Sequence, residues 1–210
     1  MDETDRSDDE QRMDGLEVTA CERCPELVDS RSQIVNGDGP NDADVLFVGE
    51  GPGATEDREG KPFVGRSGSV LDEQLRIVGL DRETVRITNC VRCRPPKNRD
   101  PTKTELANCR GYLETEIDRL DPEVIVTLGK VPSEHLLERS VAVTKEAGTV
   151  EDVRLGGTPR RVLICLHPAA TLYDRSQLET FEATLETAAE LAGVDRNGSS
   201  GGGQSRLDGF

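Results

Sequence analysis

The chain is poor in the residues that build large apolar surfaces. It has no tryptophan, and aromatic residues make up 3% and hydrophobic residues 34% of its 210 residues. No apolar run approaches the ~20 residues that a membrane-spanning helix needs. The first ten residues, MDETDRSDDE, carry six acids and lack the apolar segment of a secretory signal. We therefore expect one domain with its own core, located in the cytoplasm and without membrane contact.

Lysine is also scarce, at five of the 26 basic residues, whereas Asp and Glu number 41 and give a net charge of −15. One interpretation is an ordinary acidic protein with acidic ends. The other is adaptation to concentrated salt, in which self-repulsion is screened because the Debye length falls to ~3 Å at 1 M. The acid excess, the scarce lysine and the few large apolar side chains together favour a salt-adapted protein.

The central part of the chain alternates short apolar runs with helical patterns, which predicts parallel βα units. Strands are expected at 45–48, 85–88, 124–127 and 162–166, and the Gly156-Gly157 turn predicts a hairpin over 150–166. Helices are expected to begin near Leu16, Ser67, Thr102, Lys130 and Ser176. The predicted fold class is α/β, a three-layer α/β/α sandwich around a short, mainly parallel sheet.

Both ends of the chain differ from this central part in composition. Residues 1–14 are acidic and are predicted to form a disordered tail. Residues 196–210 are rich in Gly and Ser and are predicted to form a flexible tail. The single domain is accordingly expected at residues 15–195.

Four of the six cysteines have a spacing that suggests a metal centre. Cys21 and Cys24 form a C-x2-C pair, Cys93 lies in a Pro-rich loop, and Cys109 lies in the helix that follows. Thiols stay reduced in the cytoplasm, where clustered cysteines more often bind metal than form disulfides. A zinc ribbon normally has a second C-x2-C pair, and Cys90 with Cys93 offers one but leaves Cys109 over. The spacing alone fits a [4Fe–4S] cluster at least as well as zinc.

Polar and glycine residues follow the predicted strands. A Gly-rich turn, GEGPG, follows the first strand, Asn89 ends the second, and His167 follows the last. The turn matches neither the dinucleotide-binding pattern nor a P-loop. Phe63 lies between Pro and Gly on a predicted loop, where an aromatic ring can stack on a flat ligand. Because parallel strands end at one edge of a sheet, Gly51, Asn89 and His167 are candidates for one ligand site.

The segment from Arg86 to Arg99, RITNCVRCRPPKNR, holds five basic residues and no acid. In a chain this acidic, the asymmetry indicates a surface that contacts phosphate. The alternative is a solvated loop whose charges pair with acids elsewhere. The candidate phosphate contacts within it are Arg92, Arg94, Lys97 and Arg99.

In this order, the motifs resemble those of the family 4 uracil-DNA glycosylases, the iron–sulfur type of bacteria and archaea. The matching pieces are C-E-R-C, V-G-E-G-P-G-A-T-E-D, K-P-F-V-G-R-S-G, I-T-N, C-R-P-P-K-N-R-x-P, the later Cys109, and H-P-A-A. They extend over roughly residues 16–191. The resemblance implies an α/β/α sandwich and a [4Fe–4S] cluster on Cys21, Cys24, Cys93 and Cys109. It also implies a monomer that acts on uracil-containing DNA and leaves an abasic site for base excision repair.

The resemblance further implies a role for each matching residue. Phe63 would stack on uracil, Asn89 would hydrogen-bond its N3–H and O4, and Glu56 would crowd the C5 position. Glu50 and Gly51 would contact O2 and leave a place for the attacking water. His167 would stabilise the negative charge that builds on O2.

Three further features of the sequence concern a wedge residue, an extra thiol and the competing functions. Leu172, after the last strand, is the expected wedge into the duplex. Cys90 is an extra thiol with no assigned role. A non-catalytic nucleic-acid-binding module with a metal staple is the competing function, and a nucleotide hydrolase is a third, disfavoured by the absence of a P-loop lysine.

We predict that the protein loses stability as salt is removed, because the repulsion among its excess acids is then no longer screened. Thermal unfolding measured from molar KCl down to dilute buffer tests this hypothesis. A melting temperature that is unchanged in dilute buffer would contradict it.

Overall fold

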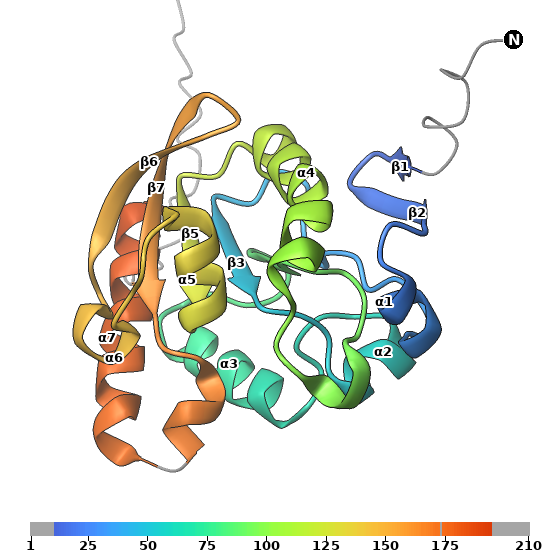
Figure 1. Cartoon of the computed structure of the whole chain (residues 1–210). Coiled ribbons are helices and arrows are strands. Elements are labelled where there is room, and N and C mark those ends of the chain that lie inside the picture. The colour runs from blue at the N-terminus through green and yellow to red at the C-terminus, as the bar shows by residue number, and fades with distance from the viewer. Residues whose placement is uncertain (1–10, 173, 195–210) are drawn as a thin grey trace, which may run out of the picture.

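A five-stranded sheet with the order β4-β3-β5-β7-β6 forms the centre of the molecule (Figure 1). The computed structural model describes residues 11–172 and 174–194. β3 pairs in parallel with β4 and β5, β5 pairs in parallel with β7, and β6 is antiparallel to β7. The strands are β3 (Val45–Gly49), β4 (Arg86–Asn89), β5 (Val124–Leu128), β6 (Val150–Leu155) and β7 (Thr158–Cys165). The expected mainly parallel sheet and the β6–β7 hairpin are confirmed.

Both faces of this sheet are covered by helices. Val45 and Phe47 of β3 belong to a core cluster with residues of α3 (Arg66–Ile77) and α7 (Arg175–Leu191). Leu46 and Val48 belong to a second cluster with residues of α4 (Lys103–Leu120) and α5 (Lys130–Leu137). Alternate residues of a strand point to opposite faces, so this strand is buried on both sides. The three-layer α/β/α arrangement is therefore confirmed.

The helix starts follow the local sequence signals. At the start of α4, Thr102 and Glu105 form a capping box, with a Thr102 N–H to Glu105 Oε2 distance of 2.7 Å. α5 begins at Lys130 as expected, and α3 and α7 each begin one residue before the expected serine. The sequence did not predict α2 (Ala54–Glu59) or α6 (Val143–Glu146), which are too short to show helical periodicity. Two short 3-10 helices, η1 (Pro96–Asn98) and η2 (Pro168–Leu172), follow β4 and β7.

The helix predicted near Leu16 is wrong. That segment forms a hairpin of β1 (Gln11–Asp14) and β2 (Glu17–Cys21), and α1 (Pro25–Ser30) begins only at Pro25. Proline fits the first turn of a helix and not its interior, which explains the late start. Residues 11–14, predicted as the end of the acidic tail, instead form β1 and pair with β2. Our expectations for residues 1–10 and 196–210 concern parts of the chain outside the described residues.

A buried carboxylate on α4 joins that helix to the edge of the sheet. Glu116 is 0% exposed and accepts hydrogen bonds from Arg86 Nε and Arg92 Nη2, each at 2.6 Å. The Arg92 side chain is 2% exposed. Its predicted contact with DNA phosphate is therefore wrong, because the guanidinium is enclosed within the protein.

Among the described helices, none is both long and apolar enough to cross a membrane.

Candidate active site

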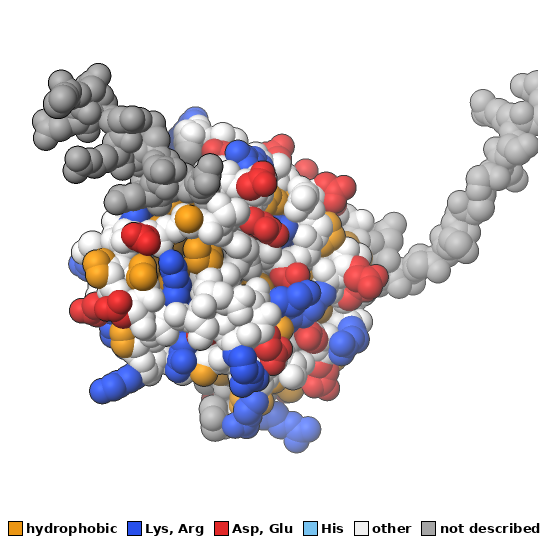
Figure 2. Space-filling model, turned by 90° about the vertical axis from the view of Figure 1, so that its right-hand side faces the viewer, with side chains coloured by type: hydrophobic (Ala, Val, Ile, Leu, Met, Phe, Trp, Pro, Cys, Tyr) orange, Lys and Arg blue, Asp and Glu red, His pale blue; other side chains and the backbone are white. Residues whose placement is uncertain are grey.

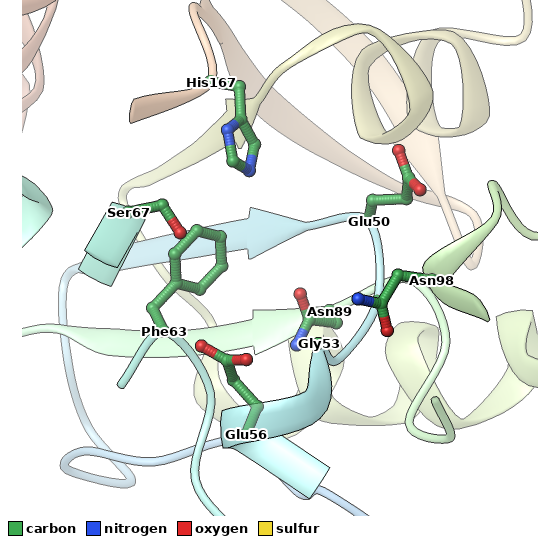
Figure 3. Close-up of a pocket in the computed structure, with 9 residues that line it drawn as sticks. Glu50, Gly53, Glu56, Phe63, Ser67, Asn89, Asn98 and His167 are labelled. Atoms are coloured by element: carbon green, nitrogen blue, oxygen red, sulfur yellow. The ribbon is translucent and has the colours of Figure 1, made fainter. Parts of the chain in front are cut away.

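The carboxyl ends of three parallel strands and one loop enclose a cavity of about 290 Å³ (Figure 3). The turn after β3, the end of β4, the segment after β7 and the loop between α2 and α3 each contribute to its wall. All six residues expected at the ligand site line it, namely Glu50, Gly51, Glu56, Phe63, Asn89 and His167. Gly53, Ser67 and Asn98 complete the lining and were not predicted.

The Phe63 ring and the Asn89 amide form two walls of this cavity. Asn89 is buried, yet its side-chain amide makes no hydrogen bond to any described residue. The amide oxygen and nitrogen open onto the cavity, so both are available to hydrogen-bond a ligand there. Gly49 lies between the walls, where an added Cβ would be 2.5 Å from Phe63 Cε2 and closer still to Asn89 Oδ1. Glycine at this position leaves both side chains the room that they occupy.

The loop that carries Phe63 is held in an unusual backbone conformation. Phe63 has φ of +52°, in the left-handed region that non-glycine residues rarely adopt, at a cost of about 1–3 kcal/mol. Directly after it, the N–H groups of Val64 and Gly65 donate to Glu56 Oε1 at 3.1 and 2.8 Å. Glu56 thus lines the cavity and also fixes the loop that bears the aromatic ring.

His167 is set up as a neutral hydrogen-bond donor. Its Nδ1 accepts from the Ala169 N–H at 3.1 Å, so the neutral ring carries its proton on Nε2, which points into the cavity (Figure 3). Burial lowers the pKa of His167 below its usual range, which favours this neutral form. The ring centroid lies 5.9 Å from that of Phe63. Gly129 after β5 lets the imidazole sit there, since a Cβ would be 3.1 Å from His167 Cβ.

Glu50 and Asn98 lie on the other side of the cavity from Phe63 (Figure 3). Burial raises the pKa of Glu50 to about 7, and the negative charge of Asp100 adds to the rise. The Asn98 Oδ1 accepts from Arg94 Nε at 2.7 Å, and the Asn98 amino group has no partner among the described residues. Asn98 was missed because its motif was interpreted as a basic surface. Within the described residues, the Gly51 N–H also has no acceptor.

Most of the basic window is neutralised by acids of the protein itself. Arg99 donates to Glu105 at 2.7 Å and to Glu26 at 2.9 Å, in addition to the burial of Arg92 on Glu116. Lys97 is exposed and Arg94 is half-buried. The pairing with acids elsewhere, which was the alternative interpretation, therefore describes much of the window.

The expected wedge residue lies on η2, directly after the segment that carries His167. The Leu172 side chain is 40% exposed, which is unusual for a large apolar residue in this protein. Tyr173, the next residue, lies outside the described part of the chain.

The four cysteines expected at the metal centre line a second, small cavity together with Leu27, Arg31 and Asn108. Cys21 ends β2, Cys24 precedes α1, Cys93 follows β4 and Cys109 lies in α4. Arg31 Nη1 donates to Cys93 Sγ at 2.9 Å, and Asn108 Nδ2 donates to Cys24 Sγ at 3.3 Å. All six cysteines are free thiols. Cys90 and Cys165 are buried in the two hydrophobic clusters instead.

Comparison with known proteins gives a consistent family. The model of the uracil DNA glycosylase superfamily matches residues 36–192. The chain is 38% identical over 181 residues to the type-4 uracil-DNA glycosylase of Archaeoglobus fulgidus, which covers 84% of this chain and 90% of the relative. It is 44% identical over 160 residues to the type-4 uracil-DNA glycosylase of Thermotoga maritima, covering 76% and 81%.

A third relative, the type-4 uracil-DNA glycosylase of Sulfurisphaera tokodaii, is 39% identical over 181 residues, covering 84% of this chain and 82% of the relative. The matched segment of the superfamily model contains the whole five-stranded sheet and every residue of the cavity. The chain belongs to the uracil-DNA glycosylase superfamily and, within it, to the type-4 family.

Proposed function

We propose that this uracil-DNA glycosylase hydrolyses the bond between uracil and deoxyribose in the cavity lined by Phe63, Asn89 and His167. The observation that carries the proposal is the Asn89 amide, which opens onto the cavity without a hydrogen bond to the described residues, in the same wall set as the Phe63 ring. The product is an abasic site, which enters base excision repair. A non-catalytic nucleic-acid-binding module would not need this combination of groups in one cavity.

Recognition of uracil follows from the chemistry of the walls. The nucleotide is flipped out of the DNA, and its base stacks on Phe63. The Asn89 Oδ1 accepts from uracil N3–H, and its amino group donates to O4. Cytosine presents the reverse pattern and would leave buried polar groups unpaired, at a cost of about 1–3 kcal/mol each. Glu56 occupies the space beside C5, where thymine carries a methyl group.

Cleavage depends on stabilising the departing uracil. The transition state is dissociative, so negative charge builds on uracil O2 as the glycosidic bond breaks. The His167 Nε2–H donates to that oxygen, and the Gly51 N–H, which has no acceptor among the described residues, is a second donor in the same cavity. Both donors are fixed before the reaction, so little reorganisation is needed when the charge appears.

The attacking water is placed by Glu50 and Asn98. An ionised Glu50 carboxylate accepts from the water and takes up its proton, and the free Asn98 amino group donates to it. A pKa of about 7 suits a general base that works near neutral pH. Arg94 is then a positioning residue for Asn98, in addition to a candidate contact to phosphate.

The cysteine cavity suits the [4Fe–4S] cluster that the family resemblance implies. A thiol sulfur is a weak acceptor, so the charged Arg31 donor at 2.9 Å from Cys93 fits a thiolate ligand better. Cys21, Cys24, Cys93 and Cys109 would hold the cluster, which supplies a structural crosslink and no reaction step.

We assign the contacts with DNA to a small number of side chains. Arg94, Lys97 and the outer part of Arg99 face the phosphate backbone, and Leu172 enters the duplex as a wedge. Figure 2 views the molecule from the side of β2, α1 and α2, and shows Lys and Arg side chains mixed with Asp and Glu side chains over most of it, with Lys and Arg side chains gathered toward the lower edge. We also propose that the protein acts as a monomer in the cytoplasm, where its free thiols stay reduced.

Incubation with a uracil-containing oligonucleotide, followed by alkali, should give strand scission at the uracil. Asn89→Asp should lower uracil removal and raise cytosine removal relative to it, because the exchange alters the donor and acceptor pattern. Asn41→Asp, an exposed amide outside the cavity, is the matched control and should behave as the natural protein. An absence of scission at every salt concentration would contradict the function, and unchanged selectivity would contradict the role of Asn89.

Single-turnover rates should rise as the pH passes through about 7 and then level off, because Glu50 must lose its proton before it can act as a base. Asp100→Asn should move this midpoint to lower pH, since it removes a negative charge that raises the Glu50 pKa. Glu50→Gln should abolish the pH dependence and lower the rate roughly 10²–10⁴-fold. Glu59→Gln, on the surface of α2, is the control and should keep the pH midpoint of the natural protein. A midpoint that does not move in Asp100→Asn would contradict the assignment of Glu50 as the base.

Protein purified without oxygen should be brown, with absorbance around 400 nm and iron bound. Cys109→Ser should lose both colour and iron, because it removes one of the four ligands. Cys90→Ser, which changes a neighbouring buried thiol, should keep them. Zinc in place of iron, or colour that survives Cys109→Ser, would contradict the ligand assignment.

A further inference from the structure

The backbone carbonyls around Phe63 are held from outside the cavity by Arg82, which lies in the turn between α3 and β4. Arg82 Nη1 donates to the Pro62 carbonyl at 3.1 Å, and Arg82 Nη2 donates to the Phe63 carbonyl. One guanidinium thus binds two successive carbonyls, a fork geometry that lysine cannot reproduce. These are the two peptide groups on either side of the left-handed residue.

Arg82 is itself fixed by carboxylates from two other segments. Its Nε donates to Asp72 on α3 at 2.7 Å, and its Nη1 lies 3.9 Å from Asp38 Oδ2. The backbone of Asp38 exchanges two hydrogen bonds, each of 2.9 Å, with Ile87 of β4. The guanidinium therefore connects the Phe63 loop to α3 and to the edge of the sheet, two rigid parts of the fold.

No neighbouring side chain among the described residues takes over the hydrogen bonds that Arg82 makes to the Pro62 and Phe63 carbonyls. On the other side of the loop, Glu56 binds only the amides after Phe63. Gly68 in the first turn of α3 packs directly against the Phe63 carbonyl, where a Cβ would collide. Removal of Arg82 would free the two carbonyls, and the peptide could relax toward the ordinary region of φ, which redirects the ring.

We propose that Arg82 is a positioning residue that fixes the Phe63 ring at the stacking distance from the uracil in the cavity. It does not line the cavity, and its side chain is 25% exposed on the outer side of the loop. The proposal rests on the stacking role proposed above for Phe63. It adds a residue that none of the sequence motifs contains.

The test is a double-mutant cycle on uracil excision with Arg82→Gln and Phe63→Ala. Arg82→Gln should lower kcat/KM roughly 10- to 100-fold, the loss expected from an ångström-scale misplacement. In the Phe63→Ala background, the same exchange should change kcat/KM less than about twofold, because no ring remains to be positioned. Added guanidinium ion should restore part of the activity of Arg82→Gln and none of Phe63→Ala.

Arg76→Gln is the matched control, since Arg76 is exposed on the neighbouring helix and its side chain makes no hydrogen bond to the described residues. It should leave kcat/KM unchanged. Thermal unfolding and binding to uracil-free DNA report whether each variant is folded. If Arg82→Gln does not fold, Asp72→Asn and Arg82→Lys replace it in the cycle, with smaller losses of the same pattern.

Equal losses in both backgrounds would mean that Arg82 acts on stability alone and would overturn the proposal. Full activity of Arg82→Gln would also overturn it, while leaving the role of Phe63 intact. Full activity of Phe63→Ala would instead refute the stacking role and, with it, the need for a positioning residue. The outcomes thus separate failure of this inference from failure of the proposed function.

Discussion

The carboxylate of Glu116 is the group on which both candidate sites depend. It is fully buried on α4 and binds Arg86 at the start of β4 and Arg92 just after its end. β4 is the four-residue edge strand of the sheet, so this one acid ties both of its ends to a long helix. Removing one partner of a buried ion pair typically costs about 3–5 kcal/mol, because the other charge is left uncompensated. The strand ends in Asn89 and leads to Cys93, so the ion pairs set the position of both.

The sheet could be predicted from the sequence because buried parallel strands appear as continuous apolar runs, and residues after such strands meet at one edge. That rule correctly grouped Gly51, Asn89 and His167. It failed for the segment at Leu16, where a short hairpin has no long periodic pattern. Burial of Arg92 could not be predicted either, since its partner Glu116 is 24 residues away and nothing local marks the pair.

The acidic surface is compatible with a DNA enzyme because affinity and base specificity come from different kinds of contact. Phosphate contacts supply affinity that falls steeply with salt, whereas stacking and buried hydrogen bonds depend on salt much less. Here the arginines of the basic window largely serve the fold, and under the proposed function specificity comes from the Phe63 and Asn89 side chains. An enzyme with few phosphate contacts is attracted only weakly to DNA in general. In return, its binding loses less affinity in concentrated salt, because it has few such contacts to lose.

Gly49 lies against both the Phe63 ring and the Asn89 amide, which form two walls of the cavity. Any side chain there would meet the Phe63 ring and the Asn89 amide at once, so a single exchange would displace the stacking surface and the hydrogen-bonding group together. Under the proposed function, variation in the bases that the enzyme accepts therefore has to come from the walls. For protein engineers who want a larger substrate, the route is to shorten a wall residue and accept its loss, because glycine has no side chain left to remove.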